Sequence, residues 1–122
     1  MKGAILVVED EQAIADLVRA YLRREGFDVV WARSGEQALE ELARHPVRLV
    51  VLDIGLPGID GYQVVRRLRQ DAEFSSIYAI ALTGYGRDED QKNARDAGFN
   101  LHLIKPIDYN NLRNTLAALA VA

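Results

Sequence analysis

The chain has 122 residues, of which 49% are hydrophobic and 27% are charged, and its formal net charge is -3. This length and composition predict a single soluble globular domain over residues 1–122 and leave no room for a second functional domain. The negative charge argues against direct nucleic acid binding, which requires a basic face, and the lack of cysteine excludes disulfides and thiolate metal sites. The apolar run at residues 4–8 is too short for a signal peptide or a membrane span, so we expect no membrane association and a cytoplasmic location.

Short apolar runs alternate with helical patterns along the chain, which is typical of a parallel sheet with helices on both faces. Strands are predicted at residues 4–8, 27–31, 49–52, 79–82 and 101–104. The runs 4–8, 49–52 and 79–82 are almost wholly apolar, so we expect them to be the central strands. Helices are predicted at 12–25, from Ser34 to just before Pro46, after Asp60, at 88–97 and after Asp108.

Local patterns define how these helices begin and which side faces the core. Ser34 and Gln37 have the spacing of a capping box, and Asp60 and Asp108 are predicted N-cap residues. The first helix carries one apolar stripe that we expect to be buried, formed by Ile14, Leu17, Val18, Tyr21 and Leu22.

Acidic residues lie at the ends of two predicted strands. Glu9 and Asp10 follow the first strand, and Asp53 follows the third. We expect these side chains to converge, because the carboxyl ends of parallel strands share one crevice. At about 5 Å and an effective dielectric constant of about 20, each ionised pair costs on the order of 3 kcal/mol, which a hard cation such as Mg²⁺ would offset. Alternatively, Glu9 and Asp10 only place negative charge at the start of the first helix, where the helix dipole favours it.

Two further polar residues lie at the same predicted edge of the sheet. Thr83 ends the fourth strand, and Lys105 follows the fifth strand and precedes Pro106. A carboxylate such as Asp53 can accept a phosphoryl group as an acyl phosphate, while a hydroxyl and an ammonium group can stabilise the phosphoryl oxygens. The simpler interpretations are a turn-forming aspartate, a β-branched strand end and a solvated loop lysine.

The combination of Glu9-Asp10, Asp53, Thr83 and Lys105-Pro106, with the loop Asp-Ile-Gly-Leu-Pro-Gly-Ile-Asp-Gly that starts at Asp53, resembles the receiver domain of two-component response regulators. The resemblance covers essentially the whole chain. It implies a flavodoxin-like α/β fold, a three-layer sandwich in which a five-stranded parallel sheet of order 2-1-3-4-5 is flanked by five helices.

The resemblance also implies the chemistry. Asp53 would be the phosphoacceptor, which takes a phosphoryl group from a phosphohistidine of a histidine kinase or a histidine phosphotransfer protein. Asp10, Asp53 and the backbone carbonyl of Gly55 would bind Mg²⁺, with Glu9 acting directly or through water. Thr83 and Lys105 would assist the transfer, and the peptide bond between Lys105 and Pro106 would be cis.

A switch is implied as well. Thr83 would move toward the phosphoryl group while an aromatic side chain of the fifth strand turns inward, changing the surface of the fourth helix, fifth strand and fifth helix. His102 occupies that aromatic position, where it is either a switch residue, with pH sensitivity near its reference pKa of about 6.5, or a strand histidine without a signalling role. Receivers with histidine here are similar to those attached to hybrid sensor kinases, so the chain is either a stand-alone receiver or a domain of a longer protein.

Competing functions differ at particular residues. A Mg²⁺-dependent phosphatase with an aspartyl nucleophile, of the haloacid-dehalogenase type, carries a second acid two residues after the nucleophile, where this chain has Gly55. We therefore expect self-catalysed phosphotransfer rather than enzymatic turnover. Self-dephosphorylation should be slow, because Gly55 has no side chain to orient water and Tyr85 can cover the acyl phosphate. A flavodoxin-like cofactor binder would need a Gly-rich or hydroxyl-rich loop in place of Glu9 and Asp10. A purely structural interaction domain remains a third class.

Overall fold

A computed structural model describes residues 4–56, 58–84 and 88–121. Within them, one parallel sheet has the strand order β2-β1-β3-β4-β5, which confirms the order that the resemblance implied. The strands are β1 (Ala4–Val8), β2 (Asp28–Ala32), β3 (Val47–Asp53), β4 (Tyr78–Thr83) and β5 (Leu101–Ile104). The helices are α1 (Gln12–Arg24), α2 (Gly35–Arg44), α3 (Gly61–Gln70), α4 (Asp88–Ala97) and α5 (Tyr109–Val121).

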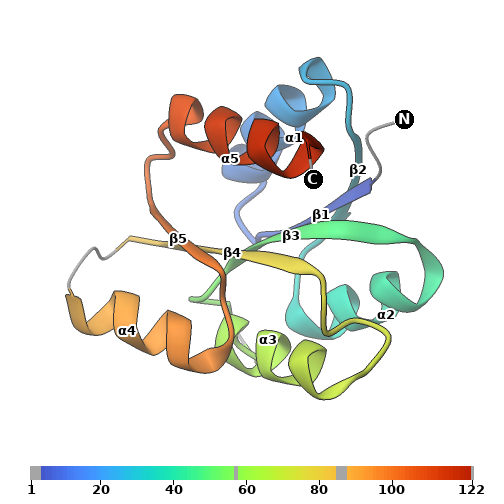
Figure 1. Cartoon of the computed structure of the whole chain (residues 1–122), viewed down its shortest axis with the longest axis vertical. Helices are drawn as coiled ribbons and strands as arrows, with labels where there is room; N and C mark the ends of the chain where they lie inside the picture. The colour runs from blue at the N-terminus through green and yellow to red at the C-terminus, as the bar shows by residue number, and fades with distance from the viewer. Residues whose placement is uncertain (1–3, 57, 85–87, 122) are drawn as a thin grey trace.

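Helices cover both faces of the sheet, with α1 and α5 on one side and α2, α3 and α4 on the other (Figure 1). Successive side chains of a strand point to opposite faces. Ile5 and Val7 of β1 therefore pack in the core beneath α1 and α5, while Leu6 and Val8 pack in the core beneath the other three helices. The three apolar strands β1, β3 and β4 are central, as predicted, because only strands buried on both faces need continuous apolar runs.

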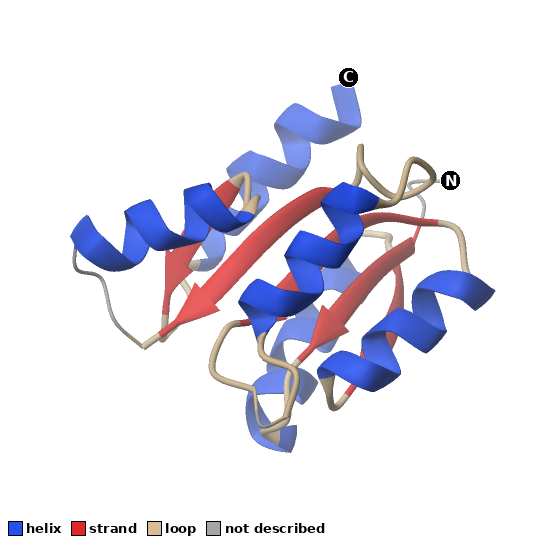
Figure 2. Ribbon diagram, turned by 90° about the horizontal axis from the view of Figure 1, so that it is seen from below, coloured by secondary structure: helices blue, strands red, loops and turns tan. Residues whose placement is uncertain are grey.

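All five strands run in the same direction, so their carboxyl ends lie along one edge of the sheet (Figure 2). The strands β3 and β4 are longer than the apolar runs that predicted them, and they include Asp53 and Thr83 as their last residues. Asp53 pairs with Leu82, and Thr83 pairs with Ile104. The backbone ladder extends through these polar residues because its hydrogen bonds do not depend on the side chain.

The helix starts are largely as predicted. The Asp60 side chain accepts the Gln63 N–H at 3.0 Å and forms a complete capping box, and the Asp108 side chain accepts the Asn110 N–H at 2.9 Å. The capping box predicted at Ser34 is only half formed. The Ser34 hydroxyl accepts the N–H of Gln37 at 3.1 Å, but the Gln37 side chain accepts the N–H of Arg33 instead of that of Ser34.

Arg69 joins several segments at the amino edge of the sheet, opposite the acidic residues. Its guanidinium donates hydrogen bonds to the carbonyls of Gly98 (2.9 Å), Ser75 (2.9 Å) and Ile77 (2.6 Å), and to the side-chain oxygen of Asn100 (2.7 Å). A charged donor is well suited to several carbonyls in a partly buried position. The C-terminal end of α4 is thereby tied to α3. None of the helices in the described part of the chain has the length and apolar character needed to cross a bilayer.

Candidate functional site

Three strand ends bring acidic and basic side chains together at the carboxyl edge of the sheet. The Lys105 ammonium lies 2.8 Å from Glu9 Oε1 and 3.2 Å from Asp53 Oδ2. Glu9 is fully buried and Asp53 is almost fully buried, while the neighbouring Asp10 is exposed. Residues that follow β1 and β5, together with the last residue of β3, therefore form one cluster, as the strand-end pattern predicted.

The carboxylates of this cluster are arranged as a cation site. One carboxylate oxygen from each of Glu9, Asp10 and Asp53 lies within 4.8 Å of the others. Lys105 supplies a single positive charge, so the fully ionised cluster keeps two negative charges in excess. Oxygen ligands with excess negative charge are the donor set that Mg²⁺ prefers, and the residues present fit this ion.

Burial and charge set the protonation of the cluster. Burial, followed by the hydrogen bond to Asp53, raises the pKa of Glu9 to about 7, although Lys105 opposes this shift. Burial acts to lower the pKa of Lys105, but its contacts with Glu9 and Asp53 outweigh burial and raise that pKa. The ammonium of Lys105 therefore stays charged, and Glu9 is the group that takes up a proton when no cation is bound.

The loop after Asp53 is held by close backbone packing. The N–H of Gly55 donates to Asp53 Oδ1 at 2.9 Å. At the end of the loop, a Cβ on Gly61 would lie 2.7 Å from the carbonyl oxygen of Asp53, so only glycine fits there. The Glu36 carboxylate of α2 accepts the N–H of Ile59 at 3.2 Å and fastens the middle of the loop to the neighbouring helix. The Asp53 carboxylate thus projects from a constrained strand end.

Thr83 and Lys105 are neighbours along the sheet edge. Thr83 is buried, and its carbonyl accepts the backbone N–H of Lys105 at 2.8 Å. The peptide bond between Lys105 and Pro106 is cis, the isomer that the resemblance implied. Among the described residues, no atom outside its immediate chain neighbours lies within 4 Å of where a Cβ on Gly84 would stand. Tyr85, which was expected to cover this region, lies outside the described residues.

His102 lies on β5, opposite Ala81 of β4, and its side chain is half-buried. Its Nε2 atom is buried and has no hydrogen-bond partner among the described residues. Burial lowers the pKa of His102, and the negative charge of Asp90 on α4 acts in the opposite direction. The neutral imidazole is therefore favoured near pH 7. Its role as a switch residue stays a prediction.

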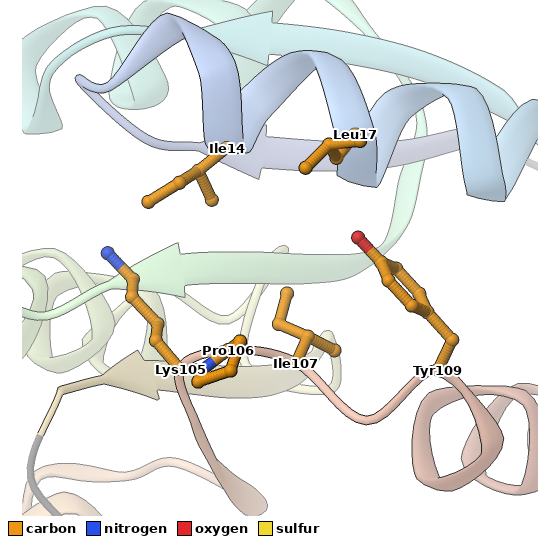
Figure 3. Close-up of a pocket in the computed structure, with 6 residues that line it drawn as sticks. All are labelled: Ile14, Leu17, Lys105, Pro106, Ile107 and Tyr109. Carbon is orange, nitrogen blue, oxygen red and sulfur yellow. The ribbon is translucent and has the colours of Figure 1, made fainter.

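An apolar pocket of about 360 Å³ lies beside the acidic cluster, between α1 and the segment that leads into α5 (Figure 3). It is lined by Ile14, Leu17, Lys105, Pro106, Ile107 and Tyr109. Leu17 is 63% exposed, so the prediction that the whole apolar stripe of α1 is buried was wrong at this residue. The helical pattern placed Leu17 beside the core-facing residues, but its side chain lines this pocket instead of the core. The pocket gives the site an apolar border that the sequence pattern did not indicate.

One contact to the cluster could not be predicted from any sequence motif. The indole Nε1 of Trp31, on the edge strand β2, donates to the backbone carbonyl of Glu9 at 3.0 Å. Trp31 lies opposite Val7 in the register of β1 and β2, so its side chain reaches past the end of β1 to contact Glu9. The tryptophan is therefore a neighbour of the site that only the structure identifies.

The fold and this edge define a doubly wound α/β protein with the flavodoxin-like strand order and an acidic cluster at its carboxyl edge. The family model described as "Response regulator receiver domain" matches residues 5–117, and the chain belongs to this family. It is a receiver domain of two-component signal transduction, and the phosphatase alternative is not favoured.

Individual relatives agree with this assignment. An uncharacterized 14.6 kDa protein of Leptolyngbya boryana is 40% identical over 104 residues, which are 85% of this chain and 79% of that protein. The response regulator Rre1 of Synechocystis sp. is 36% identical over 93% of this chain, but the match covers only 52% of Rre1, so the chain spans about half the length of such regulators. The receiver domain of the sensor histidine kinase PA1611 of Pseudomonas aeruginosa, solved with a magnesium ion in its active site cleft, is 30% identical, with a TM-score of 0.89 and coverage of 98% of both chains.

The raised pKa of Glu9 predicts a pH-dependent stability of the metal-free protein. The folded chain binds the Glu9 proton more tightly than the unfolded chain, whose reference pKa is 4.5. The resulting stabilisation is full below that value and is lost as the pH rises through about 7. We expect Glu9→Gln to gain on the order of 2 kcal/mol relative to the wild type between pH 5 and pH 8. Urea unfolding in EDTA at both pH values measures this gain, and a difference that stays constant would contradict it.

Proposed function

We propose that Asp53 accepts a phosphoryl group from the phosphohistidine of a histidine kinase or a histidine phosphotransfer protein, with Mg²⁺ bound at the acidic cluster. The observation that supports this best is the position of the Asp53 carboxylate. It lies between the ammonium of Lys105 at 3.2 Å and the N–H of Gly55 at 2.9 Å, beside two further carboxylates. Few purely structural arrangements would place three acids around one lysine, because their repulsion must be offset.

Each residue of the cluster has a part in this proposal. A carboxylate oxygen of Asp53 attacks phosphorus, the bond from phosphorus to the donor imidazole nitrogen breaks, and that nitrogen leaves with the bonding electron pair. Asp10, Asp53 and the carbonyl of Gly55 would hold Mg²⁺, with Glu9 acting directly or through water. When bound, the ion would offset the negative charge of the phosphoryl oxygens.

Lys105 and Thr83 complete the proposed transfer site. Lys105 already pairs with Asp53, so its ammonium is in place to neutralise the charge that develops on the phosphoryl group. Thr83 would donate its hydroxyl to a phosphoryl oxygen, and with His102 it would pass the change to α4, β5 and α5. The result is a signalling domain that catalyses its own phosphorylation and loses the phosphoryl group slowly. A cytoplasmic location and a single receiver domain over residues 1–122 stay predictions.

The apolar pocket beside Lys105 supports the part of the proposal that concerns the donor protein. Leu17 is one of two large hydrophobic residues that are strongly exposed in the described part of the chain, and it borders this pocket. An apolar side chain of the donor can be buried there while the phosphohistidine approaches Asp53. Burial of exposed apolar area is the usual source of affinity at such contacts.

Phosphorylation by a small donor tests the chemistry. After incubation with Mg²⁺ and phosphoramidate or acetyl phosphate, we expect intact mass spectrometry to show one added phosphoryl group on the wild type. Asp53→Asn lacks the nucleophile and Asp10→Ala lacks a metal ligand, so neither variant should gain mass, and nor should the wild type in EDTA. Mass gain by Asp53→Asn would assign the acceptor elsewhere.

The lifetime of the acyl phosphate depends on the residue at position 55. A Cβ on Gly55 would lie 3.5 Å from Asp53 Oδ1, an ordinary contact, so a side chain fits there without displacing the backbone. We expect Gly55→Asn to lose phosphate on the order of tenfold faster than the wild type, because its amide can orient water toward phosphorus. Gly55→Ala is the steric control and should match the wild type. Equal rates for all three proteins would refute this explanation.

A charge in the apolar pocket should affect protein donors but not small ones. We expect Leu17→Asp to accept phosphate from phosphoramidate at the wild-type rate, and from a phosphorylated histidine kinase that serves the wild type about tenfold more slowly. Ala20→Asp adds the same charge at another exposed position of α1 and is the control. Equal slowing of transfer to both variants would show that charge on α1, and not the pocket, is responsible.

A further inference from the structure

Trp31 makes a hydrogen bond beyond the end of the backbone ladder between β1 and β2. The last backbone bond of this pair runs from the N–H of Glu9 to the carbonyl of Ala32, at 3.1 Å. The chain then leaves β2 to begin α2 at Gly35. The carbonyl of Glu9 accepts the indole N–H of Trp31 at 3.0 Å. A side chain thus continues the pairing of β1 by one hydrogen bond.

This bond acts on the peptide unit that joins Glu9 to Asp10, directly after β1. A peptide unit is planar, so the direction of the Glu9 carbonyl also determines the direction in which the chain enters Asp10. Glu9 is buried against Lys105, whereas Asp10 is exposed. The orientation of this plane therefore contributes to where the Asp10 carboxylate lies relative to the other two acids.

The indole is itself restrained. The guanidinium carbons of Arg19 and Arg33 lie over its ring, 4.9 Å and 4.6 Å from the ring centre. Arg19 pairs with Asp16 at 3.4 Å, and Arg33 donates to the side chain of Gln12 at 3.5 Å, both on α1. Cation–π contacts of this kind favour one ring orientation. The donor is thereby held in place before any ion binds.

We propose that Trp31 is a positioning residue of the metal site, which acts by orienting the peptide between Glu9 and Asp10. This inference rests on the proposed function, because it assumes that Asp10 ligates Mg²⁺. It adds a residue of the edge strand that has no carboxylate, no contact with the ion and no place in the acidic motif. The simpler role for Trp31 is to stabilise β2 at the edge of the sheet, and the two roles predict different effects on metal affinity.

The substitution Trp31→Phe keeps an aromatic ring and removes the N–H. We expect its Mg²⁺ dissociation constant, measured by isothermal titration calorimetry, to be about threefold to tenfold higher than that of the wild type, the effect of losing one hydrogen bond. Val29→Ala is the matched control. Val29 lies two residues earlier on the same face of β2 and packs in the apolar core, so this variant weakens the edge strand without touching Glu9. Thermal unfolding measures the loss of stability in both variants.

A second measurement follows the hydrogen bond directly in the wild type. Trp31 is the only tryptophan of the chain, so its indole N–H gives a single resonance. If the bond responds to the ion, we expect this resonance to move during a Mg²⁺ titration with the same dissociation constant as the calorimetric one, because both signals then follow the same binding event.

The outcomes distinguish Mg²⁺ binding by the acidic cluster from the positioning role of Trp31. Failure of the wild type to bind Mg²⁺ would refute the proposed function and this inference with it. If the wild type binds but Trp31→Phe binds equally well, only the positioning role is wrong. Equal losses of affinity in Trp31→Phe and Val29→Ala, at equal losses of stability, would assign the effect to the edge strand and also overturn the inference.

Discussion

Electrostatic repulsion among the carboxylates of Glu9, Asp10 and Asp53 is the constraint on which the rest of the site depends. A parallel sheet directs the ends of its strands to one edge, and in this chain three of the groups collected there are acids. Lys105 offsets one negative charge, and burial together with the hydrogen bond to Asp53 raises the pKa of Glu9, which favours its protonated form when no cation is bound. Even with the Lys105 ammonium and a proton on Glu9, the cluster keeps excess negative charge, which a divalent cation can neutralise. The close packing of Gly61 against the Asp53 backbone and the hydrogen bond from the Gly55 N–H restrain the Asp53 end of this cluster.

Much of this arrangement could be predicted from the sequence, because the relevant patterns are local. Continuous apolar runs identify strands buried on both faces, and they correctly indicated that β1, β3 and β4 are central. Residues at strand ends then converge without any knowledge of side-chain packing, which is why Glu9, Asp53 and Lys105 were placed together correctly. Asp60 and Asp108 cap helices as expected, because a cap depends on residues within one turn.

The features that could not be predicted depend on contacts between segments far apart in the sequence. Leu17 belongs to an apolar stripe by its spacing, but its side chain borders an open pocket formed with the segment that leads into α5, and helical periodicity contains no information about that neighbour. Gln37 has the right position for a capping box, yet its side chain accepts the N–H of Arg33, one residue before the cap. The indole of Trp31 donates to Glu9 from a ring that lies between contacts with two arginines, which no local pattern predicts. Each case depends on the direction of a side chain and not on its identity.

The guanidinium of Arg69 also determines how α4 can move. Its hydrogen bond to Gly98 anchors the helix at its C-terminal end, at the edge of the sheet farthest from the acidic cluster. A helix of ten residues is about 15 Å long, so a tilt of about 10° around this anchor would displace its first turn by on the order of 2–3 Å and its last turn hardly at all. The helix would therefore pivot about Gly98. Any tilt of this helix would therefore be largest at its first turn, on the side of the acidic cluster, and smallest at Gly98, at the opposite edge of the sheet.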